Sequence, residues 1–301
     1  MIFAVVDIGS HTLRLAVYEK VGDGCALLTK KKFALGLAGY VKNNVMSEEG
    51  VLALLSVLRQ FRLFLSAFKI ENVSAFATAA FRMAENRDDV VARIKKETGF
   101  SVRILSGKEE AELAFIGVTK TSPVKTGVLI DIGGGSTEIV SFSNNIILME
   151  KSLPIGAVSL SKKYDAEFFP EVSVLEKING ETLGALRDAN INVTAKSALA
   201  LGGAAKGARI LLSALDGMKL KETVNFSMTI RDIRGLLERF GGNLTDADKS
   251  ILLKEVPDRI HILMVGFSML VTLLSALGVD EVYYREGGVR EGFISEVLLN
   301  A

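Results

Sequence analysis

Residues 129–136 read Leu-Ile-Asp-Ile-Gly-Gly-Gly-Ser, and residues 5–12 read Val-Val-Asp-Ile-Gly-Ser-His-Thr. In both segments an apolar strand pattern runs into Asp-Ile-Gly and then into a turn of small residues that includes a hydroxyl. Apolar residues alternate again after each turn, more regularly after the first, as in the return strand of a hairpin. Two such hairpins, each at the head of one half of the chain, indicate a duplicated domain.

Strand and helix patterns alternate in the remainder of each half. Turn residues at 121–123 mark the predicted domain boundary. We therefore expect an α/β protein with lobes at 1–123 and 124–301, whose last helix is free to pack back on the first lobe. The predicted strands cover 73–77, 102–105, 199–201, 225–228 and 281–284, and the predicted helices cover 46–68, 87–98, 110–118 and 260–279, with a last helix after the glycines at 287–288.

The composition is that of a soluble globular protein, because 49% of the 301 residues are hydrophobic and 24% are charged. The net charge of +1 provides no overall field for nucleic acid or an anionic membrane, so an anionic ligand needs a local cluster of donors. Cys25 is the only cysteine, which excludes an internal disulfide, and His11 and His261 alone do not make a His-rich metal site. Carboxylates, hydroxyls and water would therefore bind any metal, which favours Mg²⁺, Mn²⁺ or Ca²⁺.

Residues 260–279 are almost wholly apolar and about long enough to span a bilayer. Ser268 and Thr272 interrupt this segment, charges at Arg259 and Asp280 bracket it, and no second segment of this kind is evident. We interpret it as a core helix buried on most faces. Because the first residues also lack the basic region and cleavage site of a signal peptide, we expect a cytoplasmic protein without a membrane partner.

The glycine-rich turn at 133–137 is the strongest candidate for phosphate binding. Its glycines lack Cβ atoms, so backbone N–H groups can close around phosphate oxygens. Asp131, at the strand end, is placed to hold a divalent cation, and Glu138 to orient water or metal. The alternative is a glycine-rich hairpin capped by an aspartate, but the copy upstream favours phosphate binding. The predicted phosphate-binding residues are Asp7, Gly9, Ser10, Gly133, Gly134, Gly135, Ser136 and Thr137.

Two adjacent glutamates begin the helix predicted at 110–118. Ser106 and Glu109 form a capping box, which together with the helix dipole accounts for Glu109. Glu110 points about 100° further round the helix and has the chemistry of a general base that activates water. Arg82 follows a short strand, where it either binds phosphate through two N–H groups or is an ordinary solvated arginine.

Seven segments together resemble the exopolyphosphatase/guanosine pentaphosphate phosphohydrolase (Ppx/GppA) family of the actin–sugar kinase–Hsp70 superfamily. The resemblance covers nearly the whole chain and implies duplicated ribonuclease H-like (actin/Hsp70-like) domains with a cleft between them, in the short two-domain form. The segments are VVDIGSHTLRL (5–15), FATAAFRMAEN (76–86), ILSGKEEAELAFIGV (104–118), LIDIGGGSTEIV (129–140), SLPIGAVSL (152–160), ALGGAAKG (200–207) and GGVREG (287–292).

The resemblance also implies Mg²⁺-dependent hydrolysis of a terminal phosphoanhydride in inorganic polyphosphate or in guanosine pentaphosphate (pppGpp). The family's catalytic glutamate falls on Glu110 and its cleft arginine on Arg82. Its metal and phosphate-loop acids fall on Asp131 and Glu138, and a homodimer is a family-level expectation. The predicted catalytic residues are thus Glu110, Arg82 and Glu138, and the predicted metal ligands are Asp131, Glu138 and Asp7.

Five positions depart from the family's usual pattern. Ala34 and Glu112 each stand where the family has an arginine, and the loss of a phosphate-contacting guanidinium weakens the binding of a buried anion by a few kcal/mol. A shorter or different phosphorylated substrate therefore stays open beside long polyphosphate. The five departures are His11, Ala34, Glu112, Ala204 and Arg285.

Two other functions stay open on the sequence. An ATP-dependent kinase or nucleotide-driven binding protein predicts adenosine binding near Gly202 and Gly203. A non-catalytic sensor of guanosine tetra- or pentaphosphate predicts binding without phosphate release. The lysines at 30–32 are interpreted as a solvated charge run, and neither histidine is assigned a catalytic role.

Overall fold

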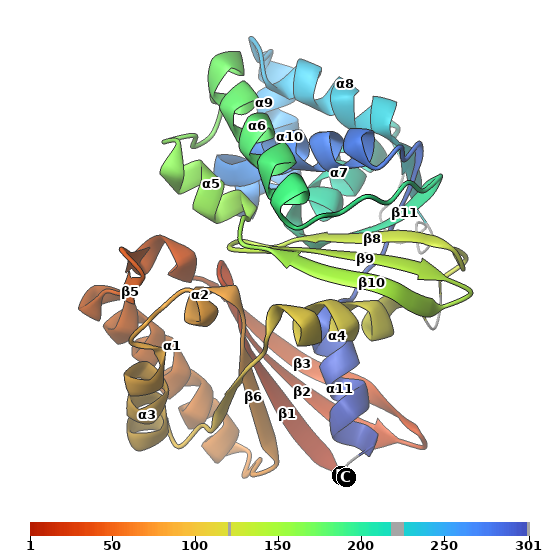
Figure 1. Ribbon diagram of the computed structural model, residues 1–301. Coiled ribbons are helices and arrows are strands. Elements are labelled where there is room, and N and C mark those ends of the chain that lie inside the picture. The colour runs from red at the N-terminus through yellow and green to blue at the C-terminus, as the bar shows by residue number, and fades with distance from the viewer. Residues whose placement is uncertain (120–121, 218–225, 300–301) are drawn as a thin grey trace.

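The computed structural model describes residues 1–119, 122–217 and 226–299, which form two lobes, each built around a β-sheet with helices packed on it (Figure 1). The first sheet has the strand order β3-β2-β1-β6-β7, in which β1 to β3 form an antiparallel meander and β6 and β7 run parallel to β1. Its strands are β1 (Ile2–Ile8), β2 (Thr12–Val21), β3 (Gly24–Ala34), β6 (Val73–Ala77) and β7 (Val102–Ile104). The other elements of this half are η1 (Leu37–Tyr40), β4 (Val41–Lys42), β5 (Val45–Met46), α1 (Glu48–Ala67), α2 (Ala79–Arg82), α3 (Arg87–Thr98) and α4 (Gly107–Thr119).

The second sheet repeats this topology. Its order is β10-β9-β8-β11-β13-β12, with β8 to β10 as the antiparallel meander and β11 and β13 running parallel. The duplication predicted from the two hairpins is confirmed, and the short strand β12 is an addition at one edge. The strands are β8 (Gly127–Ile132), β9 (Thr137–Ser143), β10 (Ile146–Leu153), β11 (Ser197–Leu201), β12 (Ser227–Thr229) and β13 (Glu281–Tyr284). The helices are α5 (Ala157–Lys163), α6 (Val172–Asp188), α7 (Gly202–Leu215), α8 (Ile230–Phe240), α9 (Asp246–Glu255), η3 (Pro257–Arg259), α10 (Ile260–Ala276) and α11 (Val289–Leu299).

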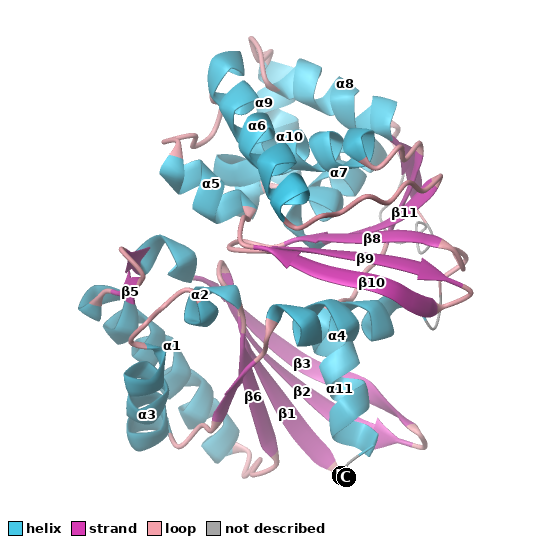
Figure 2. Cartoon of the chain, viewed as in Figure 1, coloured by secondary structure: helices cyan, strands magenta, loops and turns pink. Residues whose placement is uncertain are grey.

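Each sheet buries one face against helices of its own lobe (Figure 2). In the first lobe, α1 and α3 pack on the sheet through a core that includes Leu13, Phe61 and Ile94. In the second lobe, α7, α8 and α10 pack on the sheet through a core that includes Ile130 and Phe267. These faces follow directly from the alternation of apolar residues along the strands.

Helix α4 lies between the two sheets (Figure 1) and packs on both of them. Leu113 joins the core on the inner face of the first sheet, and Phe115 joins the core on the inner face of the second. Helix α11 returns to pack on α4 and on the first sheet, where Phe293 contacts Phe76 with ring centroids 4.7 Å apart. The lobe boundary at 123/124 stays a prediction, and Thr121 lies outside the described residues.

Two described helical segments are long and apolar enough to cross a membrane, Glu48–Ala67 and Pro257–Ala276. The expectation that only one such segment exists was therefore wrong, because α1 also meets the criterion. In α10 the polar residues are used inside the protein, since the hydroxyls of Ser268 and Thr272 both donate to Asn179 Oδ1 of α6 at 2.6 and 2.9 Å. The prediction of a buried core helix is confirmed for α10.

The predicted helices and strands are found with small shifts of their ends. The capping box is confirmed, because the Ser106 N–H donates to Glu109 Oε2 at 2.8 Å and the Glu109 N–H donates to Ser106 Oγ at 3.1 Å. The strand predicted at 225–228 is β12, which begins at Ser227, and Asn225 lies outside the described residues.

Candidate functional site

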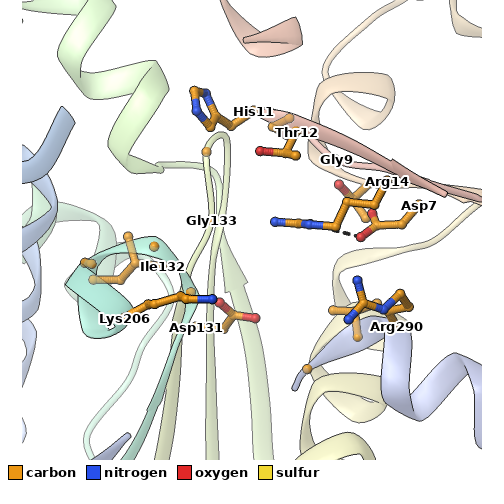
Figure 3. Close-up of a pocket in the computed structure, with 18 of the residues that line it drawn as sticks. Asp7, Gly9, His11, Thr12, Arg14, Asp131, Ile132, Gly133, Lys206 and Arg290 are labelled. Carbon is orange, nitrogen blue, oxygen red and sulfur yellow. Dashed lines mark hydrogen bonds and ion pairs between the residues drawn. The ribbon is translucent and has the colours of Figure 1, made fainter. Parts of the chain in front are cut away.

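A cavity of about 490 Å³ lies between the lobes, where the two hairpin turns, the start of α4 and the turn before α11 meet. Figure 3 shows Asp7, Arg14 and Arg290 on one wall, with Asp131 and Lys206 on the wall opposite. The inner faces of both sheets are apolar near α4 and become polar only where they reach this cavity. The fold thus opens one polar space between two apolar layers.

Asp7 and Asp131 occupy equivalent places at the ends of β1 and β8, and both line the cavity. Their cross-strand neighbours differ. Asp7 is paired in register with Arg14, whose Nη1 donates to Asp7 Oδ2 at 3.0 Å, whereas Asp131 is paired in register with Glu138. The duplicated hairpins therefore give one aspartate a positive neighbour and the other a negative one.

Glu110 lies in the first turn of α4 and is 8% exposed on the cavity wall. Burial raises the pKa of its carboxyl and the negative charge of Asp7 adds to this, while the Arg82 guanidinium beside it lowers the pKa. Since Glu109 is held by the capping box and by Arg103, Glu110 is the glutamate of this pair that faces the cavity. This is the arrangement that the sequence predicts for a general base.

Arg82 holds Glu110 and does not itself line the cavity. Its Nη1 pairs with Glu110 and donates to the Leu105 carbonyl at 3.0 Å, while its Nη2 donates to Ser136 Oγ at 3.3 Å. Glu138 lies 3.8 Å from Arg82 Nη2, is 1% exposed and accepts a 2.7 Å hydrogen bond from Ser152. Neither Arg82 nor Glu138 is among the residues that line the cavity, and their predicted phosphate and metal contacts stay predictions. Arg82 contacts both Glu110 and Ser136, which do line it.

The two glycine-rich turns contact each other directly. A Cβ added to Gly134 would lie 3.1 Å from the backbone nitrogen of His11, and one added to Gly135 would lie 2.9 Å from Ser10 Oγ. The Ser10 hydroxyl in turn accepts a hydrogen bond from the Ala80 N–H at 3.1 Å. These glycines are needed for the close approach of the lobes, which is a role that the phosphate interpretation alone did not include.

The predicted phosphate-binding residues separate into two groups. Asp7, Gly9, Ser10, Gly133, Gly134 and Ser136 line the cavity, and Gly135 and Thr137 do not. Thr137 is fully buried and its hydroxyl donates to the Ile155 carbonyl at 2.8 Å, so this hydroxyl is already used within the protein. Within the described parts of the chain, the Gly134 N–H has no backbone acceptor, which leaves it available to an anion.

Asp131 is buried near other acids that line the cavity. Burial, with the charges of Glu110 and Asp7, raises the pKa of Asp131 to about 7, and Arg14 lowers it. Among the described residues, no group of three or more His, Cys, Asp or Glu side chains is arranged to hold a metal ion. Mg²⁺ commonly uses one or two carboxylates together with water and substrate phosphates, and Asp131 and Asp7 fit that pattern. Glu138 lies beside Asp131 on the same face of the sheet, but it is 1% exposed and is not among the residues that line the cavity.

Eight basic residues line the cavity, and the sequence motifs predict a binding role for none of them. The sequence predicts that the lysines at 30–32 are solvated, but Lys30 and Lys32 lie on the inner face of β3, where Lys32 is paired in register with Arg14. The alternation of Arg14 with the apolar residues of β2 is the signal that could have identified this face. The eight residues are Arg14, Lys30, Lys31, Lys32, Lys206, Arg259, Arg285 and Arg290.

The five departures from the family pattern lie in different surroundings. His11, Ala204 and Arg285 line the cavity, and Ala204 packs closely against Gly266 of α10. Glu112 lies 3.8 Å from Lys108 on the exposed side of α4, and Ala34 is exposed at the end of β3. The structure gives no reason for the change at Ala34.

The sequence pattern of the Ppx/GppA phosphatase family matches residues 16–301. The chain belongs to the Ppx/GppA phosphatase family. A guanosine-5'-triphosphate,3'-diphosphate pyrophosphatase of Pseudoalteromonas translucida is 26% identical over 99% of this chain, which spans 59% of that relative's length. A putative exopolyphosphatase of Haemophilus influenzae is 25% identical over 99% of this chain and 91% of its own, and exopolyphosphatase 1 of Mycobacterium tuberculosis is 28% identical over 99% and 88%.

Solved structures share this fold over the full length of the chain. An exopolyphosphatase from Cytophaga hutchinsonii superposes with a TM-score of 0.86 at 22% identity, covering 100% of this chain and 99% of that one. The Ppx/GppA family member from Aquifex aeolicus gives a TM-score of 0.79 at 23% identity, covering 100% and 98%. The two-lobed architecture is therefore the architecture of the family.

Proposed function

We propose that this chain is a phosphoanhydride hydrolase that releases the terminal phosphate of inorganic polyphosphate or of pppGpp, with Mg²⁺ as its cofactor. Relatives with 25–28% identity carry the names exopolyphosphatase and guanosine-5'-triphosphate,3'-diphosphate pyrophosphatase. The observation that carries the proposal is the position of Glu110, a buried carboxylate at a helix start, in a cavity that is also lined by three aspartates, a glycine turn and eight basic residues.

Glu110 would act as the general base. A water molecule beside its carboxylate loses a proton to it while the water oxygen attacks the terminal phosphorus atom, and the bond to the bridging oxygen breaks as the shortened chain leaves. Burial raises the pKa of Glu110 and makes the carboxylate a stronger base than a solvated one. Arg82 keeps it ionised and fixes its direction, which makes Arg82 a positioning residue.

Asp7 and Asp131 would hold Mg²⁺, since both line the cavity and together leave negative charge that Arg14 only partly balances. The bound ion would supply charge neutralisation at the phosphate oxygens. The Gly134 N–H would donate to an oxygen of the terminal phosphate, because it donates no hydrogen bond to a backbone carbonyl of the described residues.

The basic side chains would bind the remaining phosphates. Lys30 and Lys32 extend this wall on the first lobe, and Lys206 and Arg259 extend it on the second. The chain's net charge of +1 gives a polyanion little overall attraction, so binding needs a local cluster of positive charges. These basic residues form such a cluster.

Phosphate release from polyphosphate, pppGpp and ATP, each with Mg²⁺ and with EDTA, tests the proposal. We expect metal-dependent release from polyphosphate or pppGpp. Turnover of ATP alone would contradict it and favour the kinase-like alternative. Binding of guanosine pentaphosphate without any release would also contradict it and identify a sensor.

A further inference from the structure

The chain contains two histidines, and the fold brings them together across the lobes. His11 lies in the turn between β1 and β2, and His261 is the second residue of α10. Their ring centroids are 5.5 Å apart and the ring planes are inclined by 42°. Residues 250 positions apart, each from a different lobe, therefore present two imidazoles to each other at the edge of the cavity.

The spacing of the two rings matches that of two imidazoles on one metal ion. With Zn–N bonds of about 2.0–2.1 Å and tetrahedral angles, the ring centroids of two such ligands lie roughly 5–6 Å apart. Among the described residues, His11 Nδ1 is buried and has no hydrogen-bond partner. A buried imidazole nitrogen without a partner is costly unless something occupies it, and a metal ion can do so.

Both rings are in the state that binds metal. Burial is the main cause that lowers the pKa of His11 to about 4 and also lowers the pKa of His261, so both imidazoles are neutral near pH 7. A neutral imidazole has a free lone pair, whereas a protonated one must first lose its proton.

The charges around the pair are mixed. Lys32, Arg259 and Arg14 face His11, but Asp258 lies 2.9 Å from Lys32 and balances it. Lys162 and Glu167 face His261 and form an ion pair with each other. The nearby cations disfavour the binding of a dication. The negative charges of Asp258, which interacts with His11, and of Glu167, which interacts with His261, offset this repulsion.

We infer that His11 and His261 form a two-histidine site for a divalent transition-metal ion of the Zn²⁺, Ni²⁺ or Cu²⁺ class, and that a bound ion ties the lobes together at the cavity edge. Water fills the remaining coordination positions. Imidazole nitrogen selects these ions over Mg²⁺, which prefers oxygen ligands, so this site and the aspartates of the cavity take different metals. The inference depends on the pair alone and stands whether or not the chain hydrolyses phosphoanhydrides.

The first test is a titration of the full chain, carrying no affinity tag, with ZnCl₂ followed by NMR of ¹⁵N-labelled histidine. Because only two imidazoles contribute, we expect both to shift together and to stop shifting at one equivalent of Zn²⁺, with MgCl₂ leaving them unchanged. The inference is overturned if neither ring responds, if only one responds, or if Mg²⁺ has the same effect.

The second test is isothermal titration calorimetry with NiCl₂ on His11→Asn and His261→Asn. Each change removes one of two protein ligands, so we expect affinity to fall by about a hundredfold or more, beyond the 10–100-fold typical of outer-shell changes. Lys162→Gln, which removes a cation beside His261 but no metal ligand, is the matched control and should not lower the affinity. Wild-type affinity in either histidine variant would refute the site, and the NMR titration decides the question on the unmodified chain if a variant does not fold.

Discussion

At the scale of single residues, the site depends on a carboxylate that the fold keeps buried but ionised. Glu110 is nearly enclosed, and its pKa is raised by burial and held down by Arg82. The same guanidinium also spans to Ser136 in the opposite lobe, so it fixes Glu110 relative to the glycine turn. The base is therefore tuned and positioned by one arginine that does not itself reach the cavity.

Replacing Arg82 with methionine should move the pH dependence of phosphate release. A general base works only when deprotonated, so the rate falls as the pH drops through the pKa of Glu110. Without the guanidinium this pKa rises, by about 1–3 units for the loss of a close opposite charge, and the fall should begin at correspondingly higher pH. The pH profile of kcat measures this. Arg59→Met, which removes an exposed ion pair with Glu97, should leave the profile in place, and an unshifted profile in Arg82→Met would contradict the positioning role.

At the scale of secondary-structure elements, the close crossing of α4 and α11 sets where Glu110 lies. A Cβ added to Gly117 of α4 would lie 2.2 Å from the carbonyl oxygen of Gly288, and one added to Gly292 of α11 would lie 2.0 Å from that of Leu113. Distances this short to backbone atoms cannot be relieved by a side-chain rotation. Glycine is therefore required at both places because the two helices approach without intervening side chains.

The variant Gly117→Ala should lose about 1–3 kcal/mol of unfolding free energy, because the added methyl group overpacks a rigid contact. Urea denaturation measures the change. Gly180→Ala is the matched control, since it lies in α6 with nothing within 4 Å of the added Cβ, and it should gain about 0.5–1 kcal/mol from improved helix propensity. Equal effects at the two sites would refute the crossing as the cause.

At the scale of the whole molecule, charge is gathered in the cavity although the chain as a whole carries a formal charge of only +1. All three lysines of β3 border the cavity, but only Lys30 and Lys32 lie on the face of Arg14, whereas the ammonium of Lys31 lies 4.1 Å from the ring centroid of Phe64 on the other face. Substrate attraction should therefore depend on which of three consecutive lysines is changed.

The double variant Lys30→Gln, Lys32→Gln should raise KM by roughly 30-fold with little change in kcat, because two charges that attract the phosphates are removed and each is worth on the order of 1 kcal/mol at close range in water. The effect should shrink as ionic strength rises. Steady-state kinetics at low and high salt provide the measurement. Lys31→Gln removes one charge of the same kind from the opposite face, and a KM effect as large as half that of the double variant (on the logarithmic scale) would contradict this account.

Much of this architecture could be predicted from the sequence, because the duplicated hairpins, the capping box and the helix that presents Glu110 are local patterns. Tertiary packing decides what the local patterns did not predict. Thr137 and Glu138 follow the glycine turn in sequence, but they point to opposite faces of β9, where Thr137 bonds to the Ile155 carbonyl and Glu138 to Ser152. The eight basic residues come from five separate segments, and only the folded chain shows that they meet.

The most direct test of the account is single-turnover phosphate release by Glu110→Gln, compared with Glu109→Gln and the wild type, in the presence of Mg²⁺. The amide keeps the shape of the side chain but cannot accept a proton, so release should slow by about 10²–10⁴-fold while substrate binding is retained. Glu109→Gln, which alters the capping residue next to it, should release phosphate at close to the wild-type rate. Wild-type release by Glu110→Gln would show that this carboxylate is not the base.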